Sequence, residues 1–268
     1  MATPFEKTVD GLEKQLAVDH IAHHYLTSRL MSLLTASATE DHPSRIVYLS
    51  STAHLMAPST LFPIPGKLDE EKTYSAWPAY GRAKVANILD ARAWAKRTDT
   101  SKVLINAIHP GAVNTELFDK ATGAFSFINP VIVGAKNAFG SLFLKTPDQG
   151  CVTSLYVATS TDIVKNKWSG CYFEPYGVKK EPSKLARNDE EMEKLWTWTE
   201  ETIERVLQGK ATVTESKVDT VQDQPTEDAS ASAEPVVTAE VSTEAQPSEV
   251  TTSAPVEPVV MAEQQAES

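Results

Sequence analysis

The chain has 268 residues, and its formal net charge of −11 is concentrated near the C-terminus. The whole chain has 36 acidic and 25 basic residues. Residues 209–268 contain 12 acidic and 2 basic residues, which leaves 24 acidic and 23 basic residues in residues 1–208. A body this close to neutral offers no broad basic field, so nucleic acid is not an expected partner.

Targeting and redox features of the sequence favour the cytoplasm. No stretch approaches the roughly 18 uninterrupted apolar residues of a membrane-spanning helix, and no apolar run follows a basic region at the N-terminus. The two cysteines, Cys151 and Cys171, cannot form a disulfide framework and are expected to be reduced, partly buried thiols. We therefore expect a cytoplasmic protein with no transmembrane segment.

The first half of the body alternates helix and strand patterns. Helical periodicity extends over residues 8–36, where apolar side chains recur near one face: Leu12, Leu16, Ile21, Leu26, Leu30 and Leu33. Residues 46–49, within RIVYLSS, are typical of a parallel strand buried on both faces. A proline-rich loop leads to a second helical pattern over residues 79–98, and VLINAI at residues 103–108 predicts a second buried strand.

The second half continues this alternation. Pro147 predicts the start of a helix that runs to about Thr159, because proline fits the first helical turn. Residues 168–173 indicate a third strand, and residues 189–207 an acidic amphipathic helix that ends at Gly209. Strands separated by helices predict an α/β fold with a parallel sheet, right-handed crossovers and flanking helices.

The chain divides by composition into a folded domain, residues 1–208, and a disordered acidic tail, residues 209–268. The tail is rich in Thr, Ser, Ala, Pro, Glu and Val and has too few large apolar groups to offset the entropy of ordering it. It is either a docking or phosphorylation segment or a solvated extension without a fixed partner, and its composition favours the extension.

A candidate acid–base pair stands at the start of the second helix. Tyr80 and Lys84, in the run AYGRAK, are four residues apart, which places a phenol and an ammonium on one helix face. A nearby cation favours the phenolate and lowers the tyrosine pKa, so that the phenol can act as a general acid or base. The spacing alone is also common by chance in purely structural helices.

The flanking strands give this pair a context. One strand before it ends at Ser50-Ser51, and another after it ends at Pro110-Gly111. Because the carboxyl ends of parallel strands meet at one edge of a sheet, we expect Ser51, Tyr80 and the Pro110 turn to converge on one crevice.

Together these stretches resemble the short-chain dehydrogenases/reductases, and within them the retinol-dehydrogenase-like branch. The matching runs occur in the family's order over most of residues 8–173: TVDGLEKQLAVDHIAHHYLT, RIVYLSSTAH, AYGRAKVANIL, INAIHPGAVNTEL and KTPDQGCVTSLYVAT with SGCYF. The resemblance implies a Rossmann-like fold and hydride transfer between NADP or NAD and the carbonyl or alcohol group of a small-molecule substrate.

The resemblance also implies roles for individual residues. Tyr80 exchanges a proton with the substrate oxygen, Lys84 lowers the pKa of Tyr80 and contacts the nicotinamide ribose, and Ser51 hydrogen-bonds the same substrate oxygen. Four residues match the turn beside the nicotinamide: Pro110, Gly111, Val113 and Thr115.

Two further features of the family concern the substrate and the assembly. The segment 116–144 matches the variable lid, and its apolar residues indicate either a lipophilic substrate or packing of the lid on the body: Phe125, Phe127, Ile128, Phe139, Leu142, Phe143 and Leu144. The helices at residues 8–36 and 79–98 resemble the family's dimer-forming pair, which is compatible with a homodimer.

The sequence departs from the family pattern in two places. Asp19 stands where the family has a fourth catalytic residue, an asparagine, and Ala22 where it has a glycine. An ionised carboxylate only accepts hydrogen bonds, whereas an amide also donates them. In addition, no T-G-x-x-x-G-x-G loop or N-N-A-G motif occurs, so the resemblance predicts an N-terminally truncated nucleotide-binding fold. With the preceding strands absent, residues 46–49 would form an exposed apolar sheet edge.

Other functions remain as alternatives. Three histidines, His20, His23 and His24, have spacings compatible with a metal site, but no carboxylate or cysteine pattern supports one, and we expect no metal. The leading hypothesis is an NAD(P)-dependent oxidoreductase. The alternative is a catalytically inactive truncated relative, either a gene-model fragment or a scaffold, and an interaction protein acting through its tail has no motif behind it.

Overall fold

The computed structural model describes residues 1–61, 70–113 and 144–221, with side chains described as far as Gly209. In chain order its helical elements are α1 (Lys14–Leu16), the π-helical η1 (Ala17–Ile21), α2 (Ala22–Ser37), the 3-10 turn η2 (Thr52–Met56), α3 (Ala76–Arg97), α5 (Pro147–Thr159), α6 (Thr161–Lys165), the 3-10 turns η3 (Pro175–Gly177) and η4 (Leu185–Arg187), and α7 (Asp189–Val221). Its strands are β1 (Ser44–Leu49), β2 (Val103–Ile108), β3 (Tyr172–Glu174) and β4 (Val178–Lys180).

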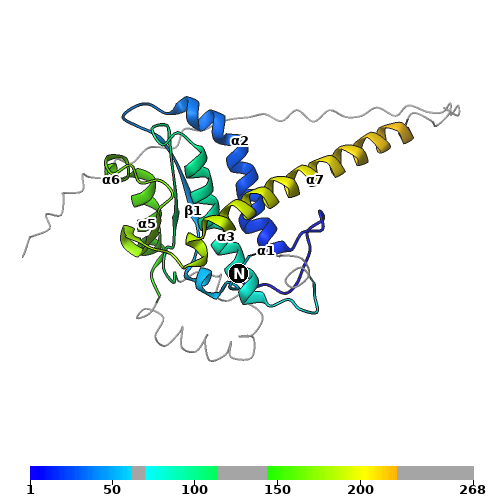
Figure 1. Ribbon diagram of the computed structural model, residues 1–268, viewed down its shortest axis with the longest axis horizontal. Helices are drawn as coiled ribbons and strands as arrows, with labels where there is room; N and C mark the ends of the chain where they lie inside the picture. Colours follow the sequence, from blue (N-terminus) through cyan, green and yellow to red (C-terminus); the bar gives the residue numbers. More distant parts are fainter. Residues whose placement is uncertain (62–69, 114–143, 222–268) are drawn as a thin grey trace, which may run out of the picture. The chain divides into compact units, whose positions relative to one another are not determined.

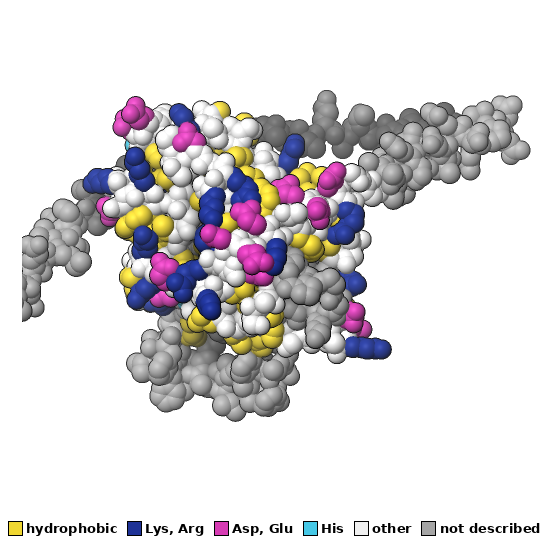
Figure 2. Space-filling model, in the orientation of Figure 1, with side chains coloured by type: hydrophobic (Ala, Val, Ile, Leu, Met, Phe, Trp, Pro, Cys, Tyr) yellow, Lys and Arg dark blue, Asp and Glu magenta, His cyan; other side chains and the backbone are white. Residues whose placement is uncertain are grey.

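These elements form the expected α/β fold, in which one sheet lies between two sets of helices. The helices α5 and α6 cover one face, and α2, α3 and α7 lie on the other side (Figure 1). The strands follow the order β1-β2-β3-β4, with β1, β2 and β3 parallel and β4 antiparallel to β3. On the face drawn in Figure 2, charged side chains of both signs are interspersed with small apolar patches.

Strand β2 is the centre of the domain, because its alternate residues enter two separate cores. Val103 and Ile105 pack towards α3, whereas Leu104 and Ile108 pack towards α5 and α6. All six residues of this strand are buried, as a central parallel strand requires.

Strand β1 differs from the expectation of burial on both faces. Tyr48 is its one buried residue, and Leu49 is 52% exposed. The reason is that β1 ends the sheet, since within the described residues it pairs on one side only, with β2. Of the predicted exposed apolar edge at residues 46–49, only Leu49 is exposed, because Tyr48 is buried and Ile46 and Val47 are partly buried.

The N-terminal helix runs from α1 through η1 into α2 without the predicted apolar face. Leu16 and Ile21 are buried, but Leu26, Leu30 and Leu33 are 55%, 40% and 66% exposed. The π-helical turn adds a residue to the helical repeat, so a 3.6-residue pattern does not carry across it. The buried side of α2 is instead formed largely by polar residues, among them His24 and Thr27.

The C-terminal half matches the predictions in part. Helix α5 has the predicted bounds, and its N-cap Thr146 forms a capping box with Gln149. The third strand is shorter than predicted, because residues 168–171 precede β3 as irregular backbone, and α6 and β4 were not predicted. Helix α7 does not end at Gly209 but continues to Val221, since one glycine inside a helix costs only about 1 kcal/mol relative to alanine.

The first compact unit of the chain is Met1–Gln222, and the second, Asp223–Ser268, lies outside the described residues. The domain boundary at residue 208 and the disorder of the tail therefore stay predictions. Both cysteines are free, but Cys151 is exposed rather than partly buried, because it lies on the outer side of α5. Among the helices of the described part, none is long and apolar enough to cross a membrane.

Candidate active site

A cavity of about 570 Å³ lies at the carboxyl ends of β1 and β2. Three segments form most of its wall: the turn after β1, the first turns of α3 and the segment after β2. They bring Ser51, Tyr80, Lys84 and Pro110 to one space, as the sequence predicted. Most other lining side chains are apolar, and a mainly apolar pocket with a few converging polar groups is typical of small-molecule sites.

Close backbone packing holds the Ser51 turn against α3. The Ser50 hydroxyl donates to the Lys84 carbonyl oxygen at 2.7 Å, and the Ser51 hydroxyl accepts from the Ala53 N–H at 3.1 Å. Gly81 allows the approach, because a Cβ there would lie 2.7 Å from both the Ala53 carbonyl oxygen and the Ala57 nitrogen. The glycine between Tyr80 and Lys84 thus sets the distance between the tyrosine and the serine.

His54 fixes the Ser51 turn from its other side, and sequence reasoning missed it. Its Nδ1 lies 2.7 Å from the Ser51 carbonyl oxygen, and its Nε2 accepts from the Ser183 N–H at 3.2 Å. These two partners require a neutral ring with the proton on Nδ1. Burial lowers the pKa of His54, which favours that neutral form. The run STAH offered no spacing that could have indicated this role.

Lys84 occupies the centre of the polar cluster. Its Nζ lies 3.4 Å from the Leu49 carbonyl oxygen and 5.4 Å from the centroid of the Tyr80 ring. It also forms an ion pair of 3.2 Å with the Oδ2 of Asp19, which extends from the π-helical turn η1. Asp19 does not line the cavity, so its carboxylate reaches the site through Lys84.

The predicted lowering of the Tyr80 pKa is wrong for this arrangement. Burial of the phenol, followed by the negative charge of Asp19, raises the pKa of Tyr80 to about 12, and a hydrogen bond with the Ser51 side chain opposes that rise only in part. Because Asp19 pairs with Lys84, the carboxylate offsets the ammonium that was expected to favour the phenolate. The Tyr80 hydroxyl is therefore protonated at neutral pH.

The segment after β2 forms a tight wall of the cavity. Gly111 has a φ of 95°, which favours glycine, and Val113 pairs with Lys145 in an isolated bridge. His109, which also lines the cavity, has its pKa lowered to about 4, chiefly by burial, and is neutral. Thr115 and residues 116–143 of the predicted lid lie outside the described residues.

Two of the three candidate metal histidines are engaged in contacts between helices. His20 Nε2 lies 2.8 Å from the Thr199 hydroxyl, and His24 bridges Asp90 and Glu200 at 2.7 Å each. In the described part of the chain, no group of three or more His, Cys, Asp or Glu side chains could hold a metal ion.

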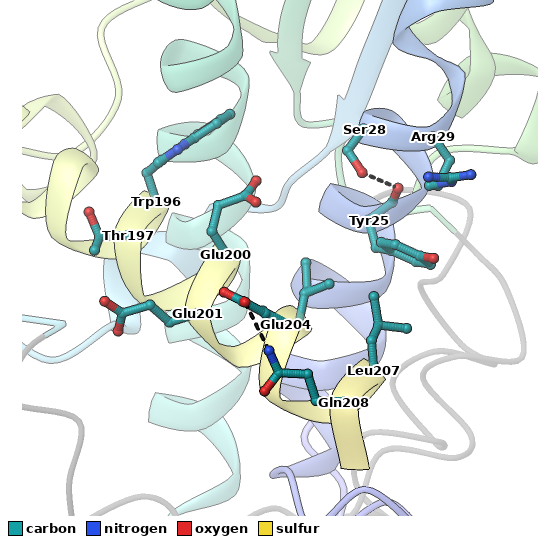
Figure 3. A pocket seen from close by; sticks show the side chains of 11 residues that line it. Tyr25, Ser28, Arg29, Trp196, Thr197, Glu200, Glu201, Glu204, Leu207 and Gln208 are labelled. Carbon is teal, nitrogen blue, oxygen red and sulfur yellow. Dashed lines mark hydrogen bonds between the residues drawn. The ribbon is translucent and has the colours of Figure 1, made fainter. Parts of the chain in front are cut away.

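A second cavity, of about 620 Å³, lies between α2 and α7 (Figure 3). Its labelled side chains come from both helices, and Figure 3 shows three glutamates on the α7 side: Glu200, Glu201 and Glu204. None of the predicted site residues lines this cavity. The chemistry expected from the sequence therefore belongs to the cavity at the sheet edge.

Comparison with known proteins gives the chain its family. No protein-family model matches it. It is 36% identical to retinol dehydrogenase 14 of Homo sapiens over 199 residues, which are 74% of this chain and 54% of that protein. Retinol dehydrogenase 12 of Mus musculus is 35% identical over 196 residues, 73% of this chain and 56% of that protein. The chain belongs to the short-chain dehydrogenase/reductase family.

Within this family, the chain falls in the retinol-dehydrogenase-like branch. An uncharacterized oxidoreductase of Schizosaccharomyces pombe is also 35% identical over 176 residues, 65% of this chain and 50% of that protein. This short-chain dehydrogenase/reductase chain thus spans about half the length of the curated relatives it matches.

Proposed function

We propose that the cavity at the sheet edge is the catalytic centre of an NAD(P)-dependent oxidoreductase. The reaction is hydride transfer between a nicotinamide and the carbonyl carbon of a lipophilic substrate, or the corresponding primary or secondary alcohol. The convergence of Ser51, Tyr80 and Lys84 on one cavity carries this proposal. The names of the relatives, retinol dehydrogenases and an oxidoreductase, support it.

The donors of the cavity suit the nicotinamide–ribose end of the cofactor. Lys84 has three N–H donors, of which the Leu49 carbonyl and Asp19 engage two in the described structure, so a third is available to a ribose hydroxyl. Pro110, Gly111 and Val113 form the wall beside it, and Thr115 completes the proposed set. When bound, the cofactor supplies the hydride.

The side chains of the cavity would hold the substrate and move the proton. Ser51 Oγ and Tyr80 Oη hydrogen-bond the substrate oxygen, and Tyr80 donates or accepts the proton there. The apolar side chains of Leu49, Met56 and Trp77 line the same cavity and suit a lipophilic substrate.

A second candidate is a catalytically inactive relative. The 268 residues include no glycine-rich loop that could cradle the pyrophosphate of a dinucleotide, and Asp19 replaces the asparagine of the family. On this alternative the cavity keeps its shape but binds no dinucleotide, and the chain acts as a scaffold.

The test joins this chain to a phosphate-binding loop. A segment that carries the family's T-G-x-x-x-G-x-G loop and N-N-A-G motif is fused before residue 1, and dinucleotide-dependent reduction of a lipophilic aldehyde is measured. We expect turnover that Tyr80→Phe lowers by ~10²–10⁴. Tyr156→Phe is the matched control, because this hydroxyl contacts Asp162 outside the cavity. A fusion that binds dinucleotide without Tyr80-dependent turnover would favour the inactive relative.

A further inference from the structure

We propose that Asp19 is a positioning residue that neutralises the Lys84 ammonium and lowers the fraction of Tyr80 present as phenolate, so that the site favours carbonyl reduction over alcohol oxidation at neutral pH. The part of this inference that concerns the direction of hydride transfer rests on the proposed function of the cavity. The protonation of Tyr80 itself can be measured without any turnover.

The geometry places the Asp19 carboxylate against Lys84, and its negative charge also acts on Tyr80. The Asp19 carboxylate lies 3.2 Å from the Lys84 Nζ, and the Lys84 side chain is only 9% exposed. The same Nζ is 5.4 Å from the centroid of the Tyr80 ring. At these distances and this burial, a carboxylate offsets most of the field that an unpaired ammonium would exert on the phenol.

In the described part of the chain, Lys84 is the one Lys or Arg side chain that lines the cavity, and Lys145 lies behind the wall against Gly111. His109, on the opposite wall segment, is kept neutral at neutral pH by burial, which lowers its pKa to about 4. Ser51 is uncharged, and Trp77 contacts the Tyr80 ring edge to face. The α-amino group of Met1 also lines this region, and burial lowers its pKa, which favours its neutral form.

The ionisation of Tyr80 reflects this arrangement. Burial first and the Asp19 charge second raise the pKa of Tyr80 to about 12, so the phenol carries its proton at neutral pH. Because the amide of an asparagine would carry no charge, it would leave the Lys84 ammonium unneutralised. The charge at position 19 therefore adds to the effect of burial on the pKa of Tyr80.

The consequence for the reaction follows from the proton balance. In reduction, a carbonyl substrate gains a hydride at carbon and the Tyr80 proton at oxygen, which gives an alcohol, an oxidised nicotinamide and a Tyr80 phenolate. One proton from the solution then restores the Tyr80 phenol, so that each reduction consumes one proton. Oxidation of an alcohol needs the phenolate at the start, and burial together with the Asp19 charge makes that form scarce.

The experiment titrates Tyr80 in the full chain carrying tyrosine labelled with ¹³C at the ζ-carbon, and Tyr80→Phe identifies the signal. From about pH 7 to about pH 11, we expect the wild-type Tyr80 to remain largely protonated. Asp19→Asn should raise its ionisation constant roughly tenfold or more, because Lys84 is then unpaired. Asp162→Asn is the matched control, since it should affect Tyr156 and leave Tyr80 unchanged.

A second variant tests whether the effect passes through Lys84. In Asp19→Asn combined with Lys84→Gln, the tenfold rise should disappear, because no cation remains beside the phenol. An unchanged Tyr80 titration in Asp19→Asn would overturn the inference, even if the fusion described above turns over substrate. In that fusion, Asp19→Asn should raise the rate of alcohol oxidation relative to carbonyl reduction at neutral pH. Absence of all turnover would refute the proposed function and its direction, whereas the titration alone decides the role of Asp19 in protonation.

Discussion

Replacement of Gly81 by alanine tests how the Ser51 turn is held against α3. An added Cβ would lie 2.7 Å from the Ala53 carbonyl oxygen and the Ala57 nitrogen, where ordinary contacts begin at 3.4 Å. Helix and turn would therefore have to separate by about 0.7 Å. Overpacking of this kind costs ~1–3 kcal/mol, and the better helix propensity of alanine offsets about 1 kcal/mol of that.

Gly209→Ala is the matched control, because it also lies inside a helix but has no atom within 4 Å of the added Cβ. This control should gain up to about 1 kcal/mol. Since the propensity gain is common to both variants, we expect their unfolding free energies to differ by ~1–3 kcal/mol. Urea denaturation followed by tryptophan fluorescence measures both values. Equal unfolding free energies would refute the close approach of α3 to the turn and its role in placing Ser51 beside Tyr80.

Further predictions concern the helix contacts, the cofactor and the sheet edge. Burial opposes the protonation of His24, but hydrogen bonds and charges from Asp90 and Glu200 outweigh it and raise the pKa above 6.5. The stability contributed by protonated His24 is complete below about pH 6.5 and is lost as pH rises through the folded-state pKa. The urea midpoint of the wild-type protein should therefore fall between about pH 6 and about pH 9, and His24→Gln should make this fall smaller. An equal fall in the variant would contradict this. Lys84→Met in the fusion with the phosphate-binding loop should weaken dinucleotide binding as well as turnover, and unchanged binding by fluorescence titration would exclude its contact with the ribose. The 268-residue chain alone should bind NADPH and NADH weakly, because it has no glycine-rich loop. It should also self-associate in size-exclusion chromatography, because among the described residues β1 pairs on one side only. Micromolar binding by a monodisperse species would show that reasoning to be wrong.

The elements that the sequence predicts well are those with long or fully buried apolar patterns. Helix α3 and strand β2 follow directly from such patterns, and α5 from its proline and its capping residues. The short strands β3 and β4 have only three residues each, too few for a periodic signal. The leucines of α2 were predicted to lie on the buried face but are exposed, because the π-helical turn shifts the helical register.

The residues of the candidate site could be predicted from the sequence, but their ion pair and the pKa of Tyr80 could not. Ser51, Tyr80 and Lys84 come to one cavity because strand ends and a helix start meet at one sheet edge. The contact of Asp19 with Lys84 joins residues 65 positions apart, and no local pattern indicates it. For the same reason, neither the raised pKa of Tyr80 nor the position of His54 beside the Ser51 turn could be predicted from local patterns.

Direct transfer of hydrogen from cofactor to substrate tests the central claim most directly. The fusion is supplied with nicotinamide dinucleotide deuterated at C4 and a lipophilic aldehyde, and the product alcohol is examined by mass spectrometry. The account predicts one deuterium on the carbinol carbon, formed at a rate that Tyr80→Phe lowers by ~10²–10⁴ while Tyr156→Phe leaves it unchanged. A product without deuterium, or a rate that does not depend on Tyr80, would contradict the assignment of this cavity as a hydride-transfer site.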